Sequence, residues 1–138
     1  MAEMNDFNQQ IIEEFRQNLG KVGGPFEGAP MVLLTTKGAK SGRSRTNPLV
    51  CQVADDGTLF VFASKAGAPT NPDWYYNLLA HPQVGVECGA DCFEATAEVV
   101  TVPERDEIFT KQVERFPDFA GYEARAHRTI PVIALRPT

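Results

Sequence analysis

Cysteine, histidine and long hydrophobic runs are all scarce in this sequence, and each scarcity excludes a class of protein. Three cysteines in 138 residues is an odd, low count that fits a reducing cytoplasm better than a disulfide-linked scaffold. No apolar run approaches the ~20 residues needed to span a bilayer. Residues 1–15 are polar and acidic, without the basic and apolar regions of a secretory signal. We therefore expect a cytoplasmic protein.

The few cysteines and histidines form no recognisable catalytic or metal-binding pattern. Cys88 and Cys92 are spaced as C-x3-C, yet a structural zinc site needs four ligands. The remaining candidates form no second pair at ligand spacing: Cys51, His81 and His127. No Ser-His-Asp order or paired-carboxylate motif stands out, which argues against hydrolysis. We expect no metal and interpret the cysteines as core or hairpin thiols.

Basic charge is scarce overall but concentrated in one segment. The net charge is -5, from 13 basic and 18 acidic residues, so general nucleic-acid binding is not expected. Lys37, Lys40, Arg43 and Arg45 nevertheless fall within nine residues that contain no acid. Such a cluster on an acidic protein predicts one localised anionic ligand rather than a long polyanion.

Hydrophobic periodicity predicts a single α+β unit of six short strands with flanking helices. The expected strands are residues 30–36, 47–54, 58–63, 84–88, 92–100 and 130–135. The expected helices are residues 5–19, 71–81, 103–116 and 117–126. Pro48 cannot donate to a ladder, so it marks an edge or a bulge. Because most strands follow one another through hairpins, we expect a small antiparallel barrel.

The predicted N-terminal helix is amphipathic. Phe7, Ile11, Phe15 and Leu19 recur every four residues, and Ile12 widens the stripe. We expect this helix to pack on the domain or to fray in solution. An alternative is a surface helix that touches the inner face of the membrane or covers a site, although its acidic polar face suits anionic lipid poorly. The expected division is a helix and linker, residues 1–29, followed by the barrel domain, residues 30–138.

Two loops carry residues suited to binding a ligand. In residues 37–45, glycines let the backbone approach a ligand, and hydroxyl and basic side chains would hold a phosphate or a carboxylate. Ala39 stands where a Walker A loop needs glycine, so that motif is excluded, and a solvated basic turn is the alternative. The second loop, residues 64–72, has small residues that would admit a flat ring. Asn71 is expected to N-cap the helix that follows, with Asp73 in its first turn. A tight loop against core aromatics is the alternative there.

A third candidate lies on the helix that precedes the last strand. Phe119, Tyr122 and Arg125 share one helix face at three-residue spacing. The phenol of Tyr122 would orient or protonate a carbonyl substrate, or else pack inward as an aromatic wedge.

Three segments, in this order, resemble the deazaflavin-dependent nitroreductase family, actinobacterial reductases that use coenzyme F420, in its class A branch. The segments are LLTTKGAKSGRSRTNPLV (residues 33–50), SKAGAPTNPDWYYNLLAHP (residues 64–82) and RTIP (residues 128–131). The resemblance extends over residues 31–137, most of the chain. It implies a split β-barrel that binds the deazaflavin in a groove.

The resemblance also implies which residues contact the cofactor. At its phosphate and glutamyl tail these would be Lys40, Ser41, Gly42 and Arg45. Along the ring they would be Asn47, Pro48 and Leu49. The ring and its polyol would meet Ser64, Lys65, Gly67 and Ala68, with Trp74 and Asn77 completing the wall.

The chemistry implied by the resemblance is hydride transfer. A 5-deazaflavin has carbon where flavin has N5, so its reduced form gives a hydride to a quinone, an activated alkene such as an enone or unsaturated lactone, or a nitroarene. Tyr122 or Ser64 would hydrogen-bond the acceptor oxygen or direct a proton to it. Phe119 and Arg125 stand where the prodrug-activating member has Tyr and Trp, which favours quinone or enone reduction over nitro-prodrugs. Two alternatives remain: an FMN-dependent oxidoreductase on the same type of barrel, and a non-catalytic deazaflavin- or ligand-binding module. A monomer and a homodimer are both compatible with the sequence.

Overall fold

Six antiparallel strands form a closed barrel in the computed structural model, which describes residues 2–21, 23 and 30–138; the side chains of residues 2–8 and 66 lie outside the described set. The strand order around the barrel is β1-β2-β3-β6-β5-β4. The strands are β1 (Met31–Lys37), β2 (Ser44–Val53), β3 (Leu59–Phe62), β4 (Gln83–Cys88), β5 (Asp91–Val99) and β6 (Val132–Pro137). The helices are α1 (Ala2–Gln17), the 3-10 helix η2 (Lys65–Gly67), α2 (Asp73–Ala80), α3 (Glu104–Arg115) and α4 (Asp118–Ala126). The predicted six-stranded α+β barrel is confirmed.

The barrel core explains why β1 is a continuous apolar run rather than an alternating one. Val32 and Leu34 point into the barrel core, where they pack with Val61 and Ile133. Leu33, on the opposite face of the same strand, is covered by α1 and has no exposed surface. A strand buried on both faces needs apolar residues at every position, since successive side chains alternate between the faces.

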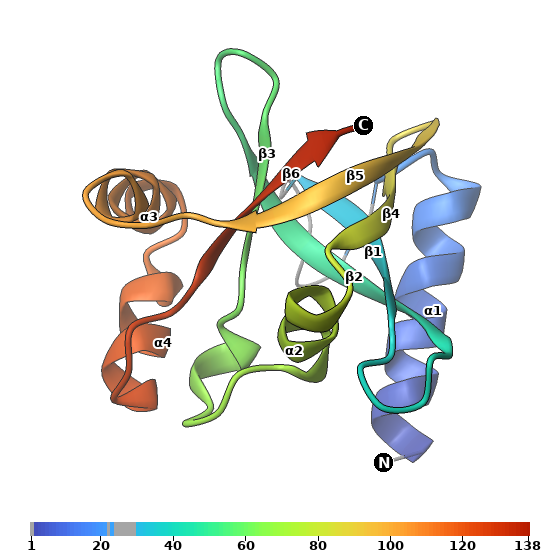
Figure 1. Ribbon diagram of the computed structural model, residues 1–138, viewed down its shortest axis with the longest axis horizontal. Helices are drawn as coiled ribbons and strands as arrows, with labels where there is room; N and C mark the ends of the chain where they lie inside the picture. Colours follow the sequence, from blue (N-terminus) through green and yellow to red (C-terminus); the bar gives the residue numbers. More distant parts are fainter. Residues whose placement is uncertain (1, 22, 24–29) are drawn as a thin grey trace.

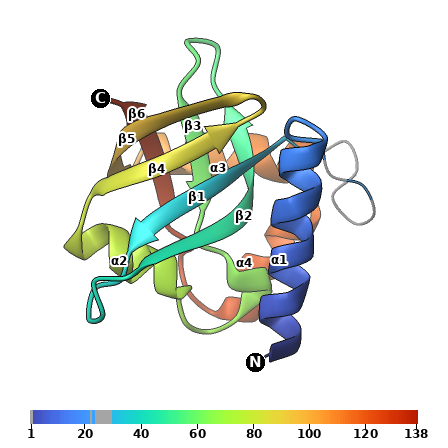
Figure 2. The ribbon, with the colours of Figure 1, turned by 90° about the vertical axis from the view of Figure 1, so that its right-hand side faces the viewer.

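Helix α1 lies along one side of the barrel, opposite α3 and α4 (Figures 1 and 2). Ile11, Ile12 and Phe15 are buried against β1 and β2, which confirms that the helix packs on the domain. The helix ends at Gln17, however, and Leu19 is 66% exposed, so its assignment to the apolar stripe was wrong. Leu19 lies beyond the last helical turn with a left-handed φ of 54°, where the helical period no longer applies. The side chain of Phe7 and the linker residues 22 and 24–29 lie outside the described residues.

The anchor of α1 on the barrel includes one long-range ion pair. Arg16 donates from Nε and Nη2 to the two carboxylate oxygens of Glu87 on β4, at 3.0 and 2.8 Å. These bonds hold the pKa of Glu87 below its usual range, and they raise the pKa of Arg16. The bidentate geometry therefore fastens the C-terminal turn of α1 to the neighbouring strand.

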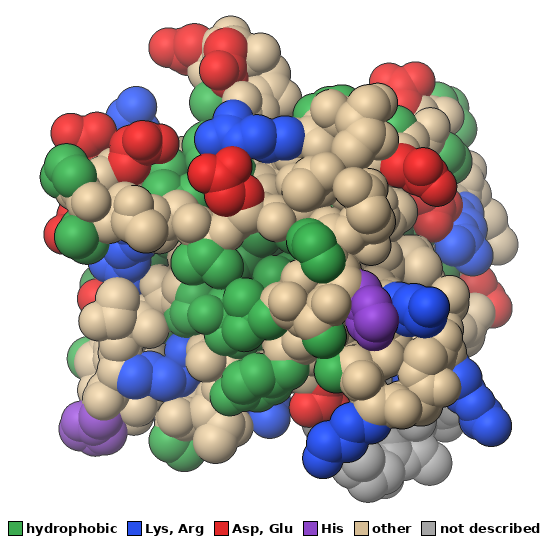
Figure 3. Space-filling model, viewed as in Figure 1, with side chains coloured by type: hydrophobic (Ala, Val, Ile, Leu, Met, Phe, Trp, Pro, Cys, Tyr) green, Lys and Arg blue, Asp and Glu red, His purple; other side chains and the backbone are tan. Residues whose placement is uncertain are grey.

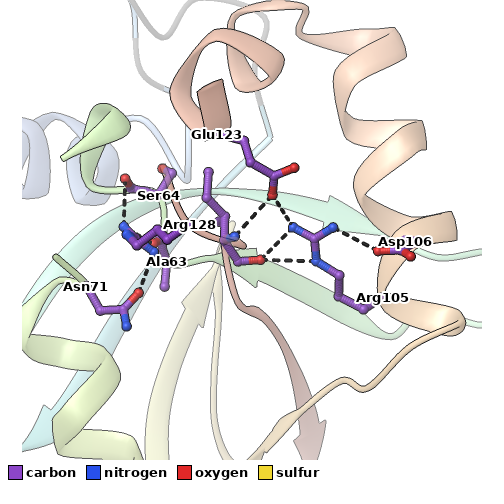
Figure 4. Close-up of polar contacts among 8 residues, drawn as sticks. Ala63, Ser64, Asn71, Arg105, Asp106, Glu123 and Arg128 are labelled. Atoms are coloured by element: carbon purple, nitrogen blue, oxygen red, sulfur yellow. Dashed lines mark hydrogen bonds and ion pairs between the residues drawn. The ribbon is translucent and has the colours of Figure 1, made fainter. Parts of the chain in front are cut away.

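A second apolar cluster fills the space between the barrel wall and helices α3 and α4. The ring of Phe62 on β3 meets the edges of Phe109 and Phe119, with centroids 6.2 and 5.5 Å apart. The buried guanidinium of Arg105 pairs with Glu123 of α4 and donates to the carbonyl oxygen of Ile130 (Figure 4). Both helices are thereby held against the start of β6.

The two loops that the sequence singled out emerge at the same end of the barrel (Figures 1 and 2). The register explains this: Lys37 is paired with Ser44 across the β1–β2 loop, and Phe62 at the end of β3 is paired with Val132 at the start of β6. Pro48 pairs with β1, whereas β3 pairs only with the last three residues of β2. The prediction that Pro48 lies at an edge is therefore confirmed.

Candidate functional site

The β1–β2 loop is a compact turn closed by its own backbone. The N–H of Gly38 donates to the carbonyl of Arg43 at 2.8 Å, and the N–H of Gly42 donates to the carbonyl of Gly38 at 3.0 Å. Gly42 has a left-handed φ of 70°. A Cβ on Gly38 would lie 2.5 Å from the Ser41 hydroxyl and 3.3 Å from the carbonyl oxygen of Arg43, so a larger residue there would displace the Ser41 side chain.

The basic side chains of this loop point into solvent without protein partners. Lys37, Lys40, Arg43 and Arg45 are all exposed. None of them is in an ion pair with a side chain in the described part of the chain, whereas Arg16 and other arginines are engaged in such pairs. Four unpaired cations on one short turn concentrate positive potential there and suit an anionic ligand.

Asn77 fastens this loop to helix α2. Its Oδ1 accepts the N–H of Ala39 at 3.0 Å, and its Nδ2 donates to the Thr36 hydroxyl at 3.2 Å. Asn77 is 9% exposed and Thr36 is 1% exposed, so the bond between their side chains is buried, whereas the bond from Ala39 is partly buried. The structure thus uses the amide of Asn77 to position the loop. Its neighbour Trp74 is 5% exposed and packs in the barrel core, so contact of either side chain with a cofactor stays a prediction.

The pleat of β2 separates the three residues expected along the ring. All three are half-buried. Leu49 packs toward the barrel core, and Asn47 lies on the same face because side chains alternate along a strand. Pro48 lies on the other face, together with Val50, which packs under α1. A flat ring that touched all three residues would have to lie across the open edge of β2.

The second loop, residues 63–71, packs against α4. Gly67 has a φ of 87°, and a Cβ there would lie 3.2 Å from both the Cα and the carbonyl oxygen of Tyr122. Only glycine permits this close approach of the two backbones. Lys65 is exposed and has a left-handed φ of 47°, while Ser64 and Ala68 are half-buried. The structure therefore brings Ser64 and Tyr122, from distant parts of the sequence, to adjoining elements.

Arg128 holds this loop from beneath (Figure 4). Its Nη2 donates to the carbonyl oxygens of Ala63, Ser64 and Thr70 at 3.0–3.3 Å. Its Nε donates to the carbonyl of Ala68 at 3.2 Å. The sequence alone predicts no role for Arg128, although this residue opens the RTIP motif. The RTIP motif was the only local indication that Arg128 has a role, because every oxygen that accepts its hydrogen bonds lies 57 or more positions away in the sequence.

Arg128 also explains why the N-cap prediction was wrong. Helix α2 begins at Asp73 behind Pro72, and no side chain caps it. The Oδ1 atom of Asn71 instead accepts a hydrogen bond from Nη1 of Arg128 at 2.6 Å. A charged donor forms a stronger bond with the amide oxygen than a helical N–H, so the tertiary contact prevails.

Tyr122 lies on the predicted helix face with Phe119 and Arg125. Its ring meets the edge of Phe119 at a centroid distance of 5.1 Å, and the guanidinium of Arg125 lies 5.3 Å from its centroid. The tyrosine is half-buried at the margin of the second apolar cluster. Its hydroxyl makes no hydrogen bond with a side chain of the described residues. The shared face is confirmed, and the catalytic roles of Tyr122 and Ser64 stay predictions.

Two of the three cysteines, Cys51 and Cys88, have an environment that disfavours the thiolate. Burial raises the pKa of Cys51 to about 12, with a smaller contribution from Cys88. Glu87 is paired with Cys92 and Cys88 with Asp91, so the two hairpin thiols lie on opposite faces of the β4–β5 ribbon. Burial, and then Asp91, raise the pKa of Cys88 as well. Thiolate chemistry is not favoured at either position.

A separate groove of about 320 Å³ lies between α3 and the β2–β3 hairpin. Its lining includes Gln52, Val53, Ile108 and Lys111. Val53 is at the opposite end of β2 from Ser44, and ten extended residues span about 30 Å. This groove is therefore distinct from the site at the two loops.

An apolar surface lies next to the site. Apolar side chains gather there between α2 and α4, below β5 (Figure 3).

Comparison with known proteins identifies one family. A family model described as F420H(2)-dependent quinone reductase matches residues 8–137. An F420H(2)-dependent quinone reductase of Mycobacterium tuberculosis is 36% identical over 125 residues, which cover 88% of this chain and 83% of that protein. These descriptions name quinone reduction, so the narrower expectation of a nitroreductase family is not confirmed.

Two solved structures share the fold at appreciable sequence identity. A structure of an F420-H2 dependent reductase is 39% identical, with a TM-score of 0.70, over 78% of this chain and 94% of that one. A structure described as a domain-swapped dimer is 34% identical, with a TM-score of 0.72, over 96% of this chain and 98% of that one.

Proposed function

The chain belongs to the F420H(2)-dependent quinone reductase family, and from this we propose that it reduces a quinone with reduced coenzyme F420. It is an oxidoreductase, and its cofactor is coenzyme F420. The observation in the structure that carries the proposal is the turn of residues 37–45, whose four exposed cations have no ion-pair partner among the described residues. When bound, the reduced deazaflavin supplies a hydride.

The residues present fit this cofactor. We propose that Lys40, Ser41, Gly42 and Arg45 bind its phosphate and glutamyl carboxylates, because the turn offers exposed cations and a glycine-rich backbone. On an otherwise acidic chain of net charge -5, such a turn would attract an anionic tail specifically. Asn77 and Thr36 would fix the turn in place from below, so the binding surface exists before the ligand arrives.

We propose that the ring lies between β2 and the second loop. Asn47, Pro48 and Leu49 border it at the open edge of β2, while Ser64, Lys65, Gly67 and Ala68 form the opposite wall, with Trp74 behind the wall. Gly67 packs this wall closely on α4, because a Cβ there would lie 3.2 Å from the backbone of Tyr122. Tyr122 follows directly behind it.

The acceptor would meet the ring beside α4. We propose that the hydroxyl of Tyr122 or Ser64 donates a hydrogen bond to the acceptor oxygen as negative charge develops on it. The apolar face between α2 and α4 suits the flat, apolar body of a quinone (Figure 3). Enones, unsaturated lactones and nitroarenes are further candidates, since each is an electron-poor acceptor that gains charge on oxygen.

We propose a homodimer as the alternative to a monomer, supported by the similar structure that is described as a domain-swapped dimer. None of the helices in residues 2–21, 23 and 30–138 is long and apolar enough to cross a membrane. Contact with the inner face of the membrane draws no support from α1, because Ile11, Ile12 and Phe15 are buried on the barrel. The cytoplasmic location and the division at residue 30 stay predictions.

Isothermal titration with F420 and with FMN tests the proposal. F420 is expected to bind far more tightly, and its affinity should fall with added salt, since exposed charge pairs are screened. Lys40→Ala and Arg45→Ala should each weaken F420 binding by about 1.5–3 kcal/mol, as expected for charge-assisted hydrogen bonds. Lys111→Ala, an exposed cation on α3, is the matched control and should leave affinity unchanged.

Three results would separate the alternatives. Equal affinity for FMN and F420 would favour an FMN-dependent oxidoreductase. Intact F420 affinity in both Lys40→Ala and Arg45→Ala would make the basic loop a solvated turn. Tight F420 binding without turnover of any quinone would leave a non-catalytic binding module.

A further inference from the structure

Arg128 lies in the middle of a set of backbone carbonyl groups. Its five contacts are all to neutral oxygens: the carbonyls of Ala63, Ser64, Ala68 and Thr70, and the side-chain amide of Asn71. No carboxylate of the described residues pairs with it. All the hydrogen bonds that the Arg128 side chain makes with the described residues therefore go to this one loop. A guanidinium fork with five N–H donors suits this task better than the single point of a lysine.

The direction of these carbonyls sets the direction of neighbouring N–H groups. In a planar trans peptide, the N–H of one residue points opposite to the carbonyl of the residue before it. The carbonyls of Ala63 and Ser64 point at Arg128, so the N–H groups of Ser64 and Lys65 point away from it. Neither of these two N–H groups finds a backbone acceptor among the described residues. Arg128 therefore leaves two adjacent donors free on the outer side of the loop.

We infer that Arg128 is a positioning residue that presents the N–H groups of Ser64 and Lys65 as a pair of donors for a carbonyl oxygen of the deazaflavin ring. This inference rests on the proposed function, because it takes F420 as the ligand. The ring is assigned rather than the phosphate because the cluster of four exposed cations lies on the other loop, whereas this loop carries Lys65 alone. Ser64 has helical backbone angles, with φ -80° and ψ -35°, and this conformation turns the N–H groups of Ser64 and Lys65 to the same side, as in the first turn of a helix.

The loop is ordered before the cofactor binds. Within it, the N–H of Gly67 donates to the carbonyl of Ser64 at 3.0 Å, and the N–H of Ala68 donates to the carbonyl of Lys65 at 3.1 Å. Arg128 stabilises this turn from one side, and the backbone of Tyr122 supports Gly67 from the other. Hydrogen exchange of the Gly67 and Ala68 amides in the free protein therefore reports on Arg128 without any turnover.

The test compares Arg128→Lys and Asn71→Ala with the wild type by NMR and by F420 titration. Arg128→Lys keeps the charge and loses the fork. Its Gly67 and Ala68 amides should exchange about tenfold faster or more in the free protein. Its F420 affinity should fall roughly 5- to 150-fold, the range for two hydrogen bonds. Asn71→Ala removes one contact of the five and should lower the affinity only a few-fold. In the wild type, added F420 should move the amide proton signals of Ser64 and Lys65 downfield.

Arg105→Lys is the matched structural control. Arg105 is buried, whereas Arg128 is half-buried; like Arg128 it donates to a backbone carbonyl, that of Ile130, but it has no hydrogen bond to the 63–71 loop. It should lower the melting temperature while loop exchange and F420 affinity stay within twofold of wild type. Equal weakening of F420 binding by Arg105→Lys would assign the effect to general destabilisation and overturn the inference. Wild-type affinity and exchange in Arg128→Lys would overturn it as well. If the wild type does not bind F420, the proposed function fails, whereas the exchange measurement still decides whether Arg128 orders the loop.

Discussion

Asn77 is the residue whose replacement tests most directly how the site is built. It is the only side chain in the described residues that bonds both to the basic loop and to β1: its Oδ1 accepts from Ala39, and its Nδ2 donates to Thr36. We predict that Asn77→Ala lowers both the free energy of unfolding and the affinity for F420. The first effect comes from buried polar groups that lose their partners, and the second from a loop that is no longer held in place.

The size of the stability effect follows from the burial of the two bonds. Each neutral hydrogen bond contributes about 0.5–1.5 kcal/mol, and the Thr36 hydroxyl, at 1% exposed, has little access to replacement water. The expected loss is therefore about 1–3 kcal/mol. For a domain of this size it corresponds to a fall in melting temperature of about 3–10 °C. Thr36→Val should recover part of this loss in the double variant, since it removes the unpaired hydroxyl.

Thermal unfolding and F420 titration measure the two effects on the same protein. Gln83→Ala is the matched control, because Gln83 also donates an amide hydrogen bond to a threonine hydroxyl, that of Thr96 at 3.1 Å, but on the exposed surface. It should change stability by less than about 0.5 kcal/mol. An Asn77→Ala variant that melts within 1 °C of wild type, as a rough threshold, and binds F420 equally well would refute the reasoning.

Two further predictions concern the acceptor side of the site and the anchor of α1. Tyr122→Phe should keep the fold and the F420 affinity but slow menadione reduction roughly 10- to 1000-fold, because a phenol that stabilises an oxyanion acts in the transition state. Steady-state rates within twofold of wild type would make Tyr122 only an aromatic wedge. Arg16 lowers the pKa of Glu87, so this pair stabilises the fold above the unfolded carboxyl pKa, and the stabilisation is lost as pH falls through the folded value. Glu87→Gln should therefore destabilise the protein by up to about 1 kcal/mol at pH 7 and by nothing at an acidic pH below the folded carboxyl pKa, in urea titrations at the two pH values. An equal deficit at both pH values would contradict this assignment, and Glu98→Gln, at a more exposed pair, is the control.

Periodicity within short segments was enough to predict most of the fold. Alternating polar and apolar residues, or apolar runs of four to seven residues, predict strands because side-chain direction along a strand repeats every two residues. This repeat is independent of distant parts of the chain. The six strands and the helices before β6 therefore appear where the sequence predicts them. The end of the N-terminal helix is an exception. Leu19 continues the four-residue spacing in the sequence, but the helix ends at Gln17, so Leu19 no longer lies on its buried face.

The basic loop was likewise readable from local chemistry. Four cations among glycines, with no acid in nine residues, predict an anion site because clustered exposed cations create a local positive potential on an otherwise acidic chain. Gly38 and Gly42 are explained by contacts and backbone angles within the same turn, so the sequence of the turn is enough to predict its shape.

Contacts between distant residues were decided only by the closure of the barrel. Arg128 contacts the 63–71 loop across 57 or more positions of sequence and binds Asn71, the expected N-cap; the RTIP motif marks Arg128 but does not show which residues it contacts. Asn77 reaches Thr36 across 41 positions for the same reason. Local propensity is a matter of a few tenths to about one kcal/mol, so a charged or buried hydrogen bond supplied by the tertiary structure prevails over it. The sequence therefore predicts which loops form the candidate site, and the packed barrel determines which side chains hold those loops in place.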